Sequence, residues 1–288
     1  MPLHTSVLAS EALDAWAIDP AGRYVDATFG AGGHTRLMLE RLGPQGRVIA
    51  FDADPLAATL VPDDPRLTLI HANFRALAEE LGERGIAAVD GVLYDLGVSS
   101  MQLDDPARGF SFRADAPLDM RLDPTRGETA AAFIAECDEA DLADAIFRYG
   151  EERNSRRIAR ALKSKLPRTT GELAAIVAAS VHVSGRRERI HPATKTFQAL
   201  RIAVNDELGA LRASLDAAAG VVRPGGRIAV ISFHSLEDRI VKLFFREDAR
   251  VQPLTRKPVV PSDAEVLSNP RARSAKLRVA TVEREVAA

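Results

Sequence analysis

Three glycines stand where a ligand could approach the protein backbone closely. Gly30, Gly32 and Gly33 follow the β-rich segment 23–29, and glycines at a strand-to-helix turn permit close approach and positive φ. The N–H groups at the start of the next helix attract an anion such as a carboxylate or a phosphate. Asp52 ends the next apolar segment, 20 residues after Gly32. An acid at that position can accept hydrogen bonds from the hydroxyls of a ribose.

The spacing of these glycines narrows the choice of nucleotide ligand. The dinucleotide fingerprint G-x-G-x-x-G requires a glycine at position 35, where this chain has Thr35. No Walker A lysine follows the glycines. A glycine loop with a strand-end acid therefore fits best an adenosine ligand whose only anion is a carboxylate. S-adenosylmethionine is such a ligand.

Four apolar segments, alternating with helical ones, would position these residues. The segments span residues 23–29, 47–52, 67–71 and 89–95, and each is apolar on both faces. Buried strands separated by helices predict an α/β fold with a parallel sheet covered on both faces. Asp95 ends the fourth segment, near the topological switch point where such sheets bind ligands.

The α/β pattern is interrupted in the middle of the chain. From about Leu103 to Thr196 no buried strand is predicted, whereas residues 155–166 and 170–181 have helical patterns. We therefore expect an α/β domain in two parts with an all-helical insertion between them. The expected parts are residues 1–104 and 197–288, and the expected insertion is 105–196.

After the insertion, the sequence predicts one long helix and then further strands. Apolar residues keep helical spacing from Phe197 to Leu215. A Pro-Gly-Gly turn and a buried strand follow. They precede a helix over 235–247 and extended segments near 251–260 and 276–285.

Composition excludes several classes of protein. Hydrophobic residues make up 46% and charged residues 27% of the 288 residues, which is close to the globular average. Cys137 is the only cysteine, so an intrachain disulfide is excluded and a cysteine-based zinc site is disfavoured. The six histidines show no metal-ligand spacing, and we expect no bound metal. The N-terminus has neither a basic region nor a long apolar run, so we expect a cytoplasmic protein without a membrane segment.

Positive charge is concentrated in one middle segment, although the net charge is only -2. Residues 148–201 carry 13 Lys and Arg against 4 Asp and Glu, whereas residues 1–104 carry 7 against 15. Arg156, Arg160 and Lys163 share one face of a predicted helix. Segregated positive charge indicates nucleic-acid binding, and a solvated helix face is the alternative explanation.

Nine long motifs cover the chain almost from end to end. They are HTSVL (4–8), DATFGAGGHT (26–35), DADP (52–55), DGVLYDLGVSSMQLDDPARGFSF (90–112), PLDMRLDPTRG (117–127), YGEERNSRRIARAL (149–162), HPATKTFQALRIAVNDEL (191–208), RPGGRIAVISFHSLEDRIVK (223–242) and NPRARSAKLRVA (269–280). With these motifs the chain resembles the bacterial RsmH/MraW family of 16S rRNA cytosine-N4 methyltransferases.

The resemblance implies a class I, Rossmann-like methyltransferase sheet with an inserted helical domain that recognises the substrate. It implies S-adenosylmethionine as methyl donor and a cytidine in the decoding region of 16S rRNA as acceptor, in free rRNA or in the small ribosomal subunit. Glycine amides suit the methionine end, Asp52 suits the ribose and Phe74 suits the adenine, while His34 is expected to contribute its backbone. The implied cofactor contacts are Gly32, Gly33, His34, Asp52, Phe74, Asp95 and Gln102.

The reaction requires that a weak nucleophile be held in place. The lone pair of the cytosine N4 amine is delocalised into the ring, so the protein must align N4, methyl and sulfur. Amine methyltransferases that act on DNA often carry an Asp/Asn/Ser-Pro-Pro-aromatic motif after the fourth strand, whereas this chain has Asp-Leu-Gly-Val at 95–98. For the group that holds the amine, our first choice is Asp95 with nearby backbone carbonyls. Our second choice is Ser232 and His234.

The resemblance also favours RNA binding by the basic insertion. We expect the phosphate contacts there and in the C-terminal segment. They are Arg153, Arg156, Arg157, Arg160, Lys163, Arg186, Arg187, Arg271, Arg273 and Lys276. A base inside a folded rRNA helix has to be flipped out to reach the methyl group. The sequence indicates no particular oligomeric state.

Two other classes of function are compatible with the residues alone. A nucleotide-sugar or NAD-type oxidoreductase is disfavoured by Thr35 in place of the third glycine. A non-catalytic RNA-binding or assembly factor with a relic cofactor fold is disfavoured by the presence of Gly32, Asp52 and Asp95.

Overall fold

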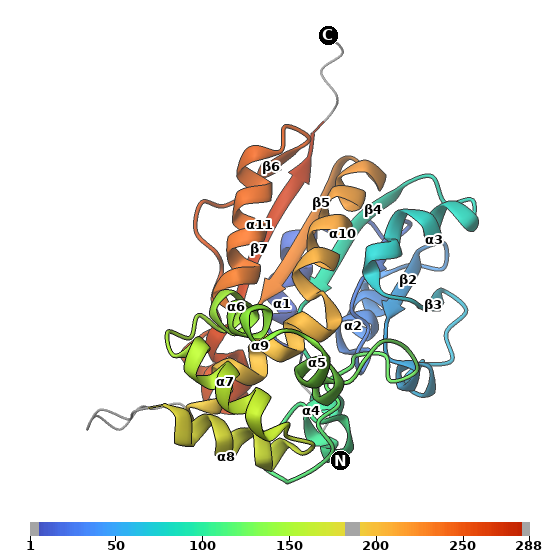
Figure 1. Cartoon of the computed structure of the whole chain (residues 1–288). Helices are drawn as coiled ribbons and strands as arrows, with labels where there is room; N and C mark the ends of the chain where they lie inside the picture. The colour runs from blue at the N-terminus through green and yellow to red at the C-terminus, as the bar shows by residue number, and fades with distance from the viewer. Residues whose placement is uncertain (1–5, 182–190, 284–288) are drawn as a thin grey trace. The chain divides into compact units, whose positions relative to one another are not determined.

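The computed structural model describes residues 6–181 and 191–283 (Figure 1). The chain divides into two compact units. The sheet unit comprises Met1–Gly97 and Leu208–Ala288, and the helical unit comprises Val98–Glu207. Within the described ranges, no helix is both long enough and apolar enough to cross a lipid bilayer.

Seven strands of the described chain form one mixed sheet in the order β3-β2-β1-β4-β5-β7-β6 (Figure 1). Neighbouring strands from β3 to β5 run parallel, and β7 runs antiparallel to β5 and β6. This is the strand order of class I methyltransferases, so the expected fold class is confirmed. The bounds are β1 Arg23–Asp26, β2 Arg47–Asp52, β3 Leu67–His71, β4 Val89–Asp95, β5 Val222–Ser232, β6 Val251–Pro253 and β7 Lys276–Val282.

Apolar side chains cover both faces of the sheet, as a central parallel strand requires. Along β4, Val92 and Tyr94 belong to a core cluster with residues of α3, α10 and α11, whereas Leu93 belongs to a second cluster with residues of α1 and α2. Alternate residues of one strand therefore anchor helices on opposite faces. The helices of this unit are α1 Ala9–Trp16, α2 Gly33–Arg41, α3 Leu77–Glu83, α10 Glu207–Val221, α11 Ser235–Glu247 and α12 Asp263–Ser268.

Strand β3 differs from the predicted burial pattern because it lies at an edge of the sheet. The sequence predicts burial on both faces, but only Ile70 is buried and Thr68 and His71 are exposed. Strand β1 is also shorter than predicted and ends at Asp26. The residues that follow it form the glycine loop instead.

The helical unit has a core of its own. Its buried cluster includes Phe110, Leu142, Leu173 and Leu200, all of which belong to this unit. The sequence predicts no buried strand in this region. Its described elements are helices, apart from an isolated bridge at Pro117. Its helices are α4 Ser100–Asp104, α5 Ala130–Glu136, α6 Glu139–Gly150, α7 Ser155–Lys165, α8 Thr170–Ser180 and α9 Ala193–Asn205.

Helix α7 ends one residue before its predicted apolar stripe is complete. The i, i+4, i+8 spacing of Ile158, Leu162 and Leu166 predicts three buried residues. The first two are buried, but Leu166 is 47% exposed. Leu166 has a φ of 46°, so the chain has already left the helix there and turned this side chain away from the core.

The long helix predicted from Phe197 to Leu215 is two helices. α9 ends at Asn205 and α10 begins at Glu207, and between them Asp206 has a φ of 46°. A left-handed residue cannot continue a right-handed helix. The apolar spacing continues across the break, so periodicity alone could not reveal it.

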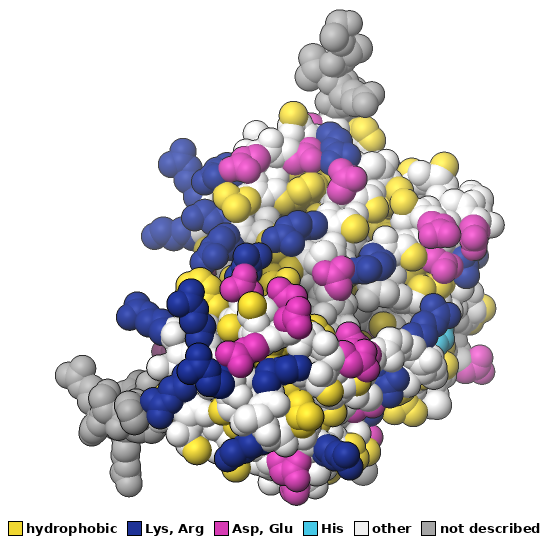
Figure 2. All heavy atoms as spheres, viewed as in Figure 1, with side chains coloured by type: hydrophobic (Ala, Val, Ile, Leu, Met, Phe, Trp, Pro, Cys, Tyr) yellow, Lys and Arg dark blue, Asp and Glu magenta, His cyan; other side chains and the backbone are white. Residues whose placement is uncertain are grey.

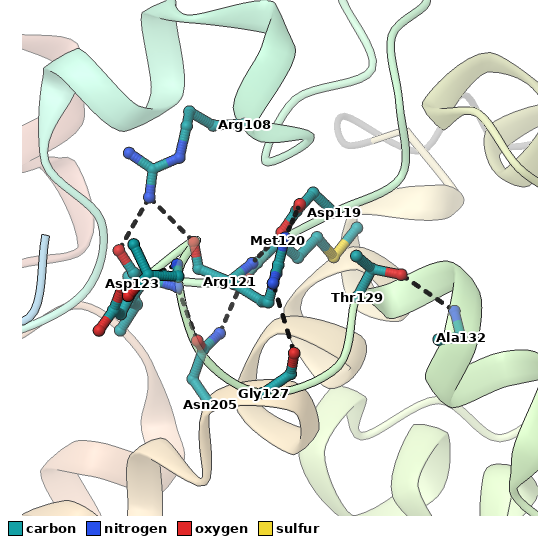
Figure 3. Close-up of polar contacts among 11 residues, drawn as sticks. Arg108, Asp119, Met120, Arg121, Asp123, Gly127, Thr129, Ala132 and Asn205 are labelled. Atoms are coloured by element: carbon teal, nitrogen blue, oxygen red, sulfur yellow. Dashed lines mark hydrogen bonds and ion pairs between the residues drawn. The ribbon is translucent and has the colours of Figure 1, made fainter.

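A polar network fixes the loop that precedes α5 in the helical unit (Figure 3). Arg108 Nη2 donates hydrogen bonds to the carbonyls of Arg121 and Leu122, at 2.9 and 2.8 Å. Asn205 donates through Nδ2 to the Met120 carbonyl at 2.8 Å and accepts from the Leu122 N–H at 2.7 Å. Met120 has a φ of 63°, a conformation that a non-glycine residue keeps only when its surroundings enforce it.

Candidate active site

Three aspartates end neighbouring strands at the carboxyl edge of the sheet. Asp26 ends β1, Asp52 ends β2 and Asp95 ends β4. Strand β1 lies between β2 and β4. The chain fills the sheet on one side of β1 with β2 and β3, and on the other side with β4 and the later strands. The strand order therefore places the three carboxylates at the topological switch point, where open α/β sheets bind ligands.

Gly32 and Gly33 form a backbone cradle with little room for a side chain. Gly32 has a φ of 75°, and a Cβ there would lie 2.7 Å from Phe29 Cζ. A Cβ on Gly33 would collide with Ser6 Oγ. Gly32 precedes α2 as its N-cap, and no described side chain caps this helix. The first N–H groups of α2 are therefore suited to an anionic ligand group.

The Asp52 carboxylate is held between two backbone donors. Gly30 N donates to Oδ2 at 2.6 Å, and Asp54 N donates to Oδ1 at 2.8 Å. Burial raises the pKa of Asp52 to about 6, and these two hydrogen bonds only partly offset that effect. A ligand hydroxyl that donates to this carboxylate would favour its charged form.

His34 is a buried side chain, 4% exposed, in the first turn of α2. Its Nε2 lies 3.4 Å from Asp95 Oδ2. Burial lowers the pKa of this imidazole, but the carboxylates of Asp95 and Asp26 more than offset burial, so the net pKa is raised. One oxygen of Asp95 thus faces the imidazole, and the other, Oδ1, is buried without a hydrogen-bond partner in the part of the chain that the structure describes.

Asp26 is not among the predicted site residues, but it lies at their centre. It is fully buried, and burial raises its pKa. Its carboxylate accepts hydrogen bonds from Thr35 Oγ1 at 2.7 Å and from Thr28 N at 3.1 Å. Thr28 Oγ1 in turn accepts from Asp95 N at 2.6 Å. The sequence predicts a strand over 23–29, which places Asp26 inside it, so its strand-end position became visible only in the structure.

The two remaining predicted cofactor contacts belong to different units. Phe74 follows β3 in the sheet unit, and its ring meets Tyr94 edge-on with the ring centroids 5.7 Å apart. Gln102 is a buried residue of α4 in the helical unit, where its Oε1 accepts a hydrogen bond from Ser99 N at 3.0 Å. Their contacts with a cofactor stay predictions.

His234 and Ser232 both have structural contacts at the end of β5. The His234 ring caps α11 by accepting from Glu237 N at 3.4 Å, and its Nε2 lies 3.2 Å from Glu237 Oε1. Ser232 Oγ donates to the Lys276 carbonyl at 3.4 Å. These contacts explain both side chains without a reaction, and their catalytic role stays a prediction.

The predicted RNA contacts of the helical unit lie in two different settings. Arg153, Arg156 and Arg157 are exposed, and Arg160 is exposed with its Nε 3.5 Å from Glu139 Oε1. Lys163 is instead occupied within the protein. Its Nζ donates to three carbonyls at the end of α5, at 3.1, 2.8 and 2.7 Å.

The other predicted RNA contacts lie elsewhere in the sequence. Arg273 is exposed and Arg271 partly exposed in the sheet unit. Lys276 Nζ donates to Asp238 Oδ2 at 3.0 Å. Arg186 and Arg187 lie outside the described residues.

Comparisons with known proteins agree over nearly the whole chain. The sequence pattern that defines the MraW methylase family matches residues 1–283. The chain is 51% identical over 304 residues to the "Ribosomal RNA small subunit methyltransferase H" of Chromobacterium violaceum, with 96% of this chain and 94% of that protein covered. It is 50% identical over 303 residues to the protein of the same name from Thiobacillus denitrificans, with 97% of both chains covered. A solved structure of an rRNA methylase from Streptococcus thermophilus is similar with a TM-score of 0.45 at 11% identity, covering 96% of this chain and 95% of that one.

Proposed function

The chain belongs to the MraW methylase family, and from this we propose that it transfers a methyl group from S-adenosylmethionine to the N4 amine of a cytidine in the decoding region of 16S rRNA. Two relatives that are 51% and 50% identical to it are named ribosomal RNA small subunit methyltransferases. The observation that supports the proposal best is the set of strand-end carboxylates, Asp26, Asp52 and Asp95, beside the glycine cradle. We place the reaction in the cytoplasm.

The residues of the cradle fit S-adenosylmethionine. The backbone N–H groups after Gly32 would hold the methionine carboxylate, since Gly32 precedes α2 and the start of a helix attracts an anion. Asp52 would accept hydrogen bonds from the ribose hydroxyls, and Phe74 would pack on the adenine. Bound there, S-adenosylmethionine supplies a methyl group on a sulfonium sulfur.

Asp95 would orient the acceptor amine. Its Oδ2 faces His34, and its Oδ1 is left to accept an N–H of the cytosine amine. Holding N4 in line with the methyl group in this way can lower the barrier by about 7–11 kcal/mol in favourable cases. As the N–C bond forms and the S–C bond breaks, N4 carries one proton in excess. The Asp95 carboxylate can accept that proton.

The helical unit would hold the rRNA through its phosphates. Arg153, Arg156, Arg157 and Arg160 are exposed and can reach a nucleic-acid backbone. Phosphate contacts fix position without reading sequence, so the target cytidine has to be selected at the carboxyl edge of the sheet.

Mass spectrometry of 16S rRNA nucleosides tests this function. In a strain that lacks the gene, N4-methylated cytidine should disappear from the decoding region. The wild-type gene should restore it, and Asp95→Ala should restore little of it. An unchanged level in the deletion strain would show that this chain methylates another target.

A thermal-shift comparison separates the proposal from an oxidoreductase. S-adenosylmethionine should raise the melting temperature of the purified protein, because a ligand that binds only the folded state stabilises it. NAD should leave the melting temperature unchanged.

A further inference from the structure

Charge is segregated within the sheet unit. Residues 1–97 carry 7 Lys and Arg against 14 Asp and Glu, whereas residues 239–278 carry 10 against 4. The strand order places β3, β2, β1 and β4 of the first segment in one half of the sheet, with β7 and β6 of the second at the opposite edge. Figure 2 shows acidic side chains near α3 and basic side chains over α11. Residues 202–288 as a whole carry 14 Lys and Arg against 11 Asp and Glu, so the basic edge becomes apparent only when 239–278 is counted separately.

Exposed cations cover the outer face of α11 and the loop that follows β6. On α11, Arg239, Lys242 and Arg246 are spaced i, i+3, i+7 and share one face, while Val241 and Phe245 on the other face are buried in the core. We name the exposed set the α11 surface. It consists of Arg239, Lys242, Arg246, Arg256 and Lys257.

The loop of the α11 surface is attached to the sheet. Leu254 N donates to the Val279 carbonyl, and Val259 N and Leu277 exchange hydrogen bonds in both directions, all at 2.9 Å. These bonds hold both ends of the loop against β7. Arg256 and Lys257 are therefore carried by a segment of defined position.

Two cations next to the α11 surface are neutralised by Asp238, and Arg246 of the surface itself pairs with Glu247. Lys276 Nζ and Arg278 Nε both donate to the Asp238 carboxylate, at 3.0 and 2.7 Å. Three members of the α11 surface make no side-chain hydrogen bond or ion pair with any residue that the structure describes. They are Lys242, Arg256 and Lys257.

We propose that the α11 surface binds the phosphate backbone of the rRNA substrate, in addition to the contacts predicted for Arg271 and Arg273 in the same unit. The identity of the RNA rests on the proposed function. Exposed cations that have no partner in the protein contribute most to the affinity for a polyanion, because their binding releases its counterions.

The test measures the affinity of the full-length protein for 16S rRNA over a series of salt concentrations. One variant combines Lys242→Gln, Arg256→Gln and Lys257→Gln. The matched control combines Arg23→Gln, Arg41→Gln and Arg84→Gln, which removes the same charge from the acidic half. S-adenosylmethionine affinity and far-UV circular dichroism verify that both variants are folded.

We expect the α11-surface variant to lose up to about 2.1 units of log–log salt slope, from about 0.7 per lost contact on single strands. The same relation predicts up to about 100-fold weaker binding at 0.1 M salt. The control should bind within about threefold of the wild type, because only long-range attraction changes and salt screens it.

Two results would overturn the proposal. The first is equal slope and affinity in the α11-surface variant and the control, which would make the surface an ordinary solvated face. The second is normal binding of free rRNA but weakened binding of whole small subunits, which would assign the surface to a ribosomal protein. If the wild type transfers no methyl group to rRNA, the proposed function fails, while the binding series still decides what the surface does.

Discussion

At Asp52, the folded protein binds a proton more tightly than the unfolded chain does. Burial raises the pKa of this carboxyl from 3.8 to about 6. Its contribution to stability is therefore fully present below pH 3.8 and is lost as the pH rises through about 6. A hydroxyl donor from a ligand reverses this effect, because it stabilises the charged carboxylate.

Cofactor binding should therefore release a proton from Asp52. At pH 6 about half of the free protein carries this proton, so binding should release about 0.5 proton, and affinity should fall as the pH decreases below 6. Calorimetry in two buffers of different ionisation enthalpy measures the release. Asp52→Asn should show none, and Asp52→Ala should bind about 1.5–3 kcal/mol more weakly. Identical heats in both buffers for the wild type would remove Asp52 from the ribose contact.

The His34 ring should position Asp95 rather than bind the cofactor. His34→Leu removes the group 3.4 Å from the Asp95 carboxylate, and a misplaced carboxylate should slow methylation at saturating substrates by up to about 100-fold. His34→Gln, whose amide can still donate to Asp95, should recover most of the rate. Single-turnover kinetics measure the rate, and calorimetry should show little change in S-adenosylmethionine affinity. If affinity falls as far as the rate in both variants, His34 acts on the cofactor instead.

Site residues at strand ends were predictable, but the contacts between them were not. Asp52 and Asp95 end apolar segments that the sequence marks clearly. The burial of the His34 ring and its approach to Asp95 depend on how α2 packs against β1 and β4. The hydrogen bonds that place Asp26 among them likewise arise only in the folded protein.

Among the loops and helices, the turn before α2 depends on Gly32. Gly32→Val should abolish detectable S-adenosylmethionine binding, because the residue has positive φ and its Cβ would crowd Phe29. Gly85→Val is a matched control. Gly85 also has positive φ, at 67°, but a Cβ there meets nothing within 4 Å. It should lose stability while retaining cofactor affinity, as calorimetry and urea unfolding can measure. Equal loss of binding in both variants would refute the cradle.

Helix α5 should depend on Lys163 for stability. The Lys163 ammonium donates to three carbonyls at the C-terminal end of α5, where a positive charge also interacts favourably with the helix dipole. Lys163→Met should lower the free energy of unfolding by about 1.5–3 kcal/mol. Lys165→Met, at an exposed neighbouring position, should change it little. Urea unfolding that gives equal values for the two variants would leave Lys163 free to bind RNA as first predicted.

The first and last residues of a strand could be predicted where a short apolar run has clear ends in the sequence. The segments 47–52, 67–71 and 89–95 are β2, β3 and β4 with the predicted bounds. The end of a helix inside a continuing apolar pattern was not predictable. Val204 and Leu208 keep the spacing on either side of Asp206, and only the backbone angle of Asp206 separates α9 from α10.

On the scale of the whole molecule, the helical unit should fold without the sheet unit. The members of its buried core all come from residues 98–207. The isolated segment should therefore show helical circular dichroism with cooperative thermal unfolding, and it should bind rRNA but not S-adenosylmethionine. Arg156→Gln with Arg160→Gln should weaken that RNA binding, since both residues are exposed. A segment without cooperative unfolding would show that its core is stable only in the full chain.

The parallel pairing of β4 with β5 has a consequence for synthesis of the chain on the ribosome. β4 ends at Asp95 and β5 begins at Val222, so 126 residues separate two adjacent strands. At about 5–20 residues per second, β4 waits roughly 6–25 s for its partner. During that interval the apolar edge of β4 is an open template for pairing with other nascent chains. We therefore expect a chaperone to protect this edge until β5 has left the ribosome.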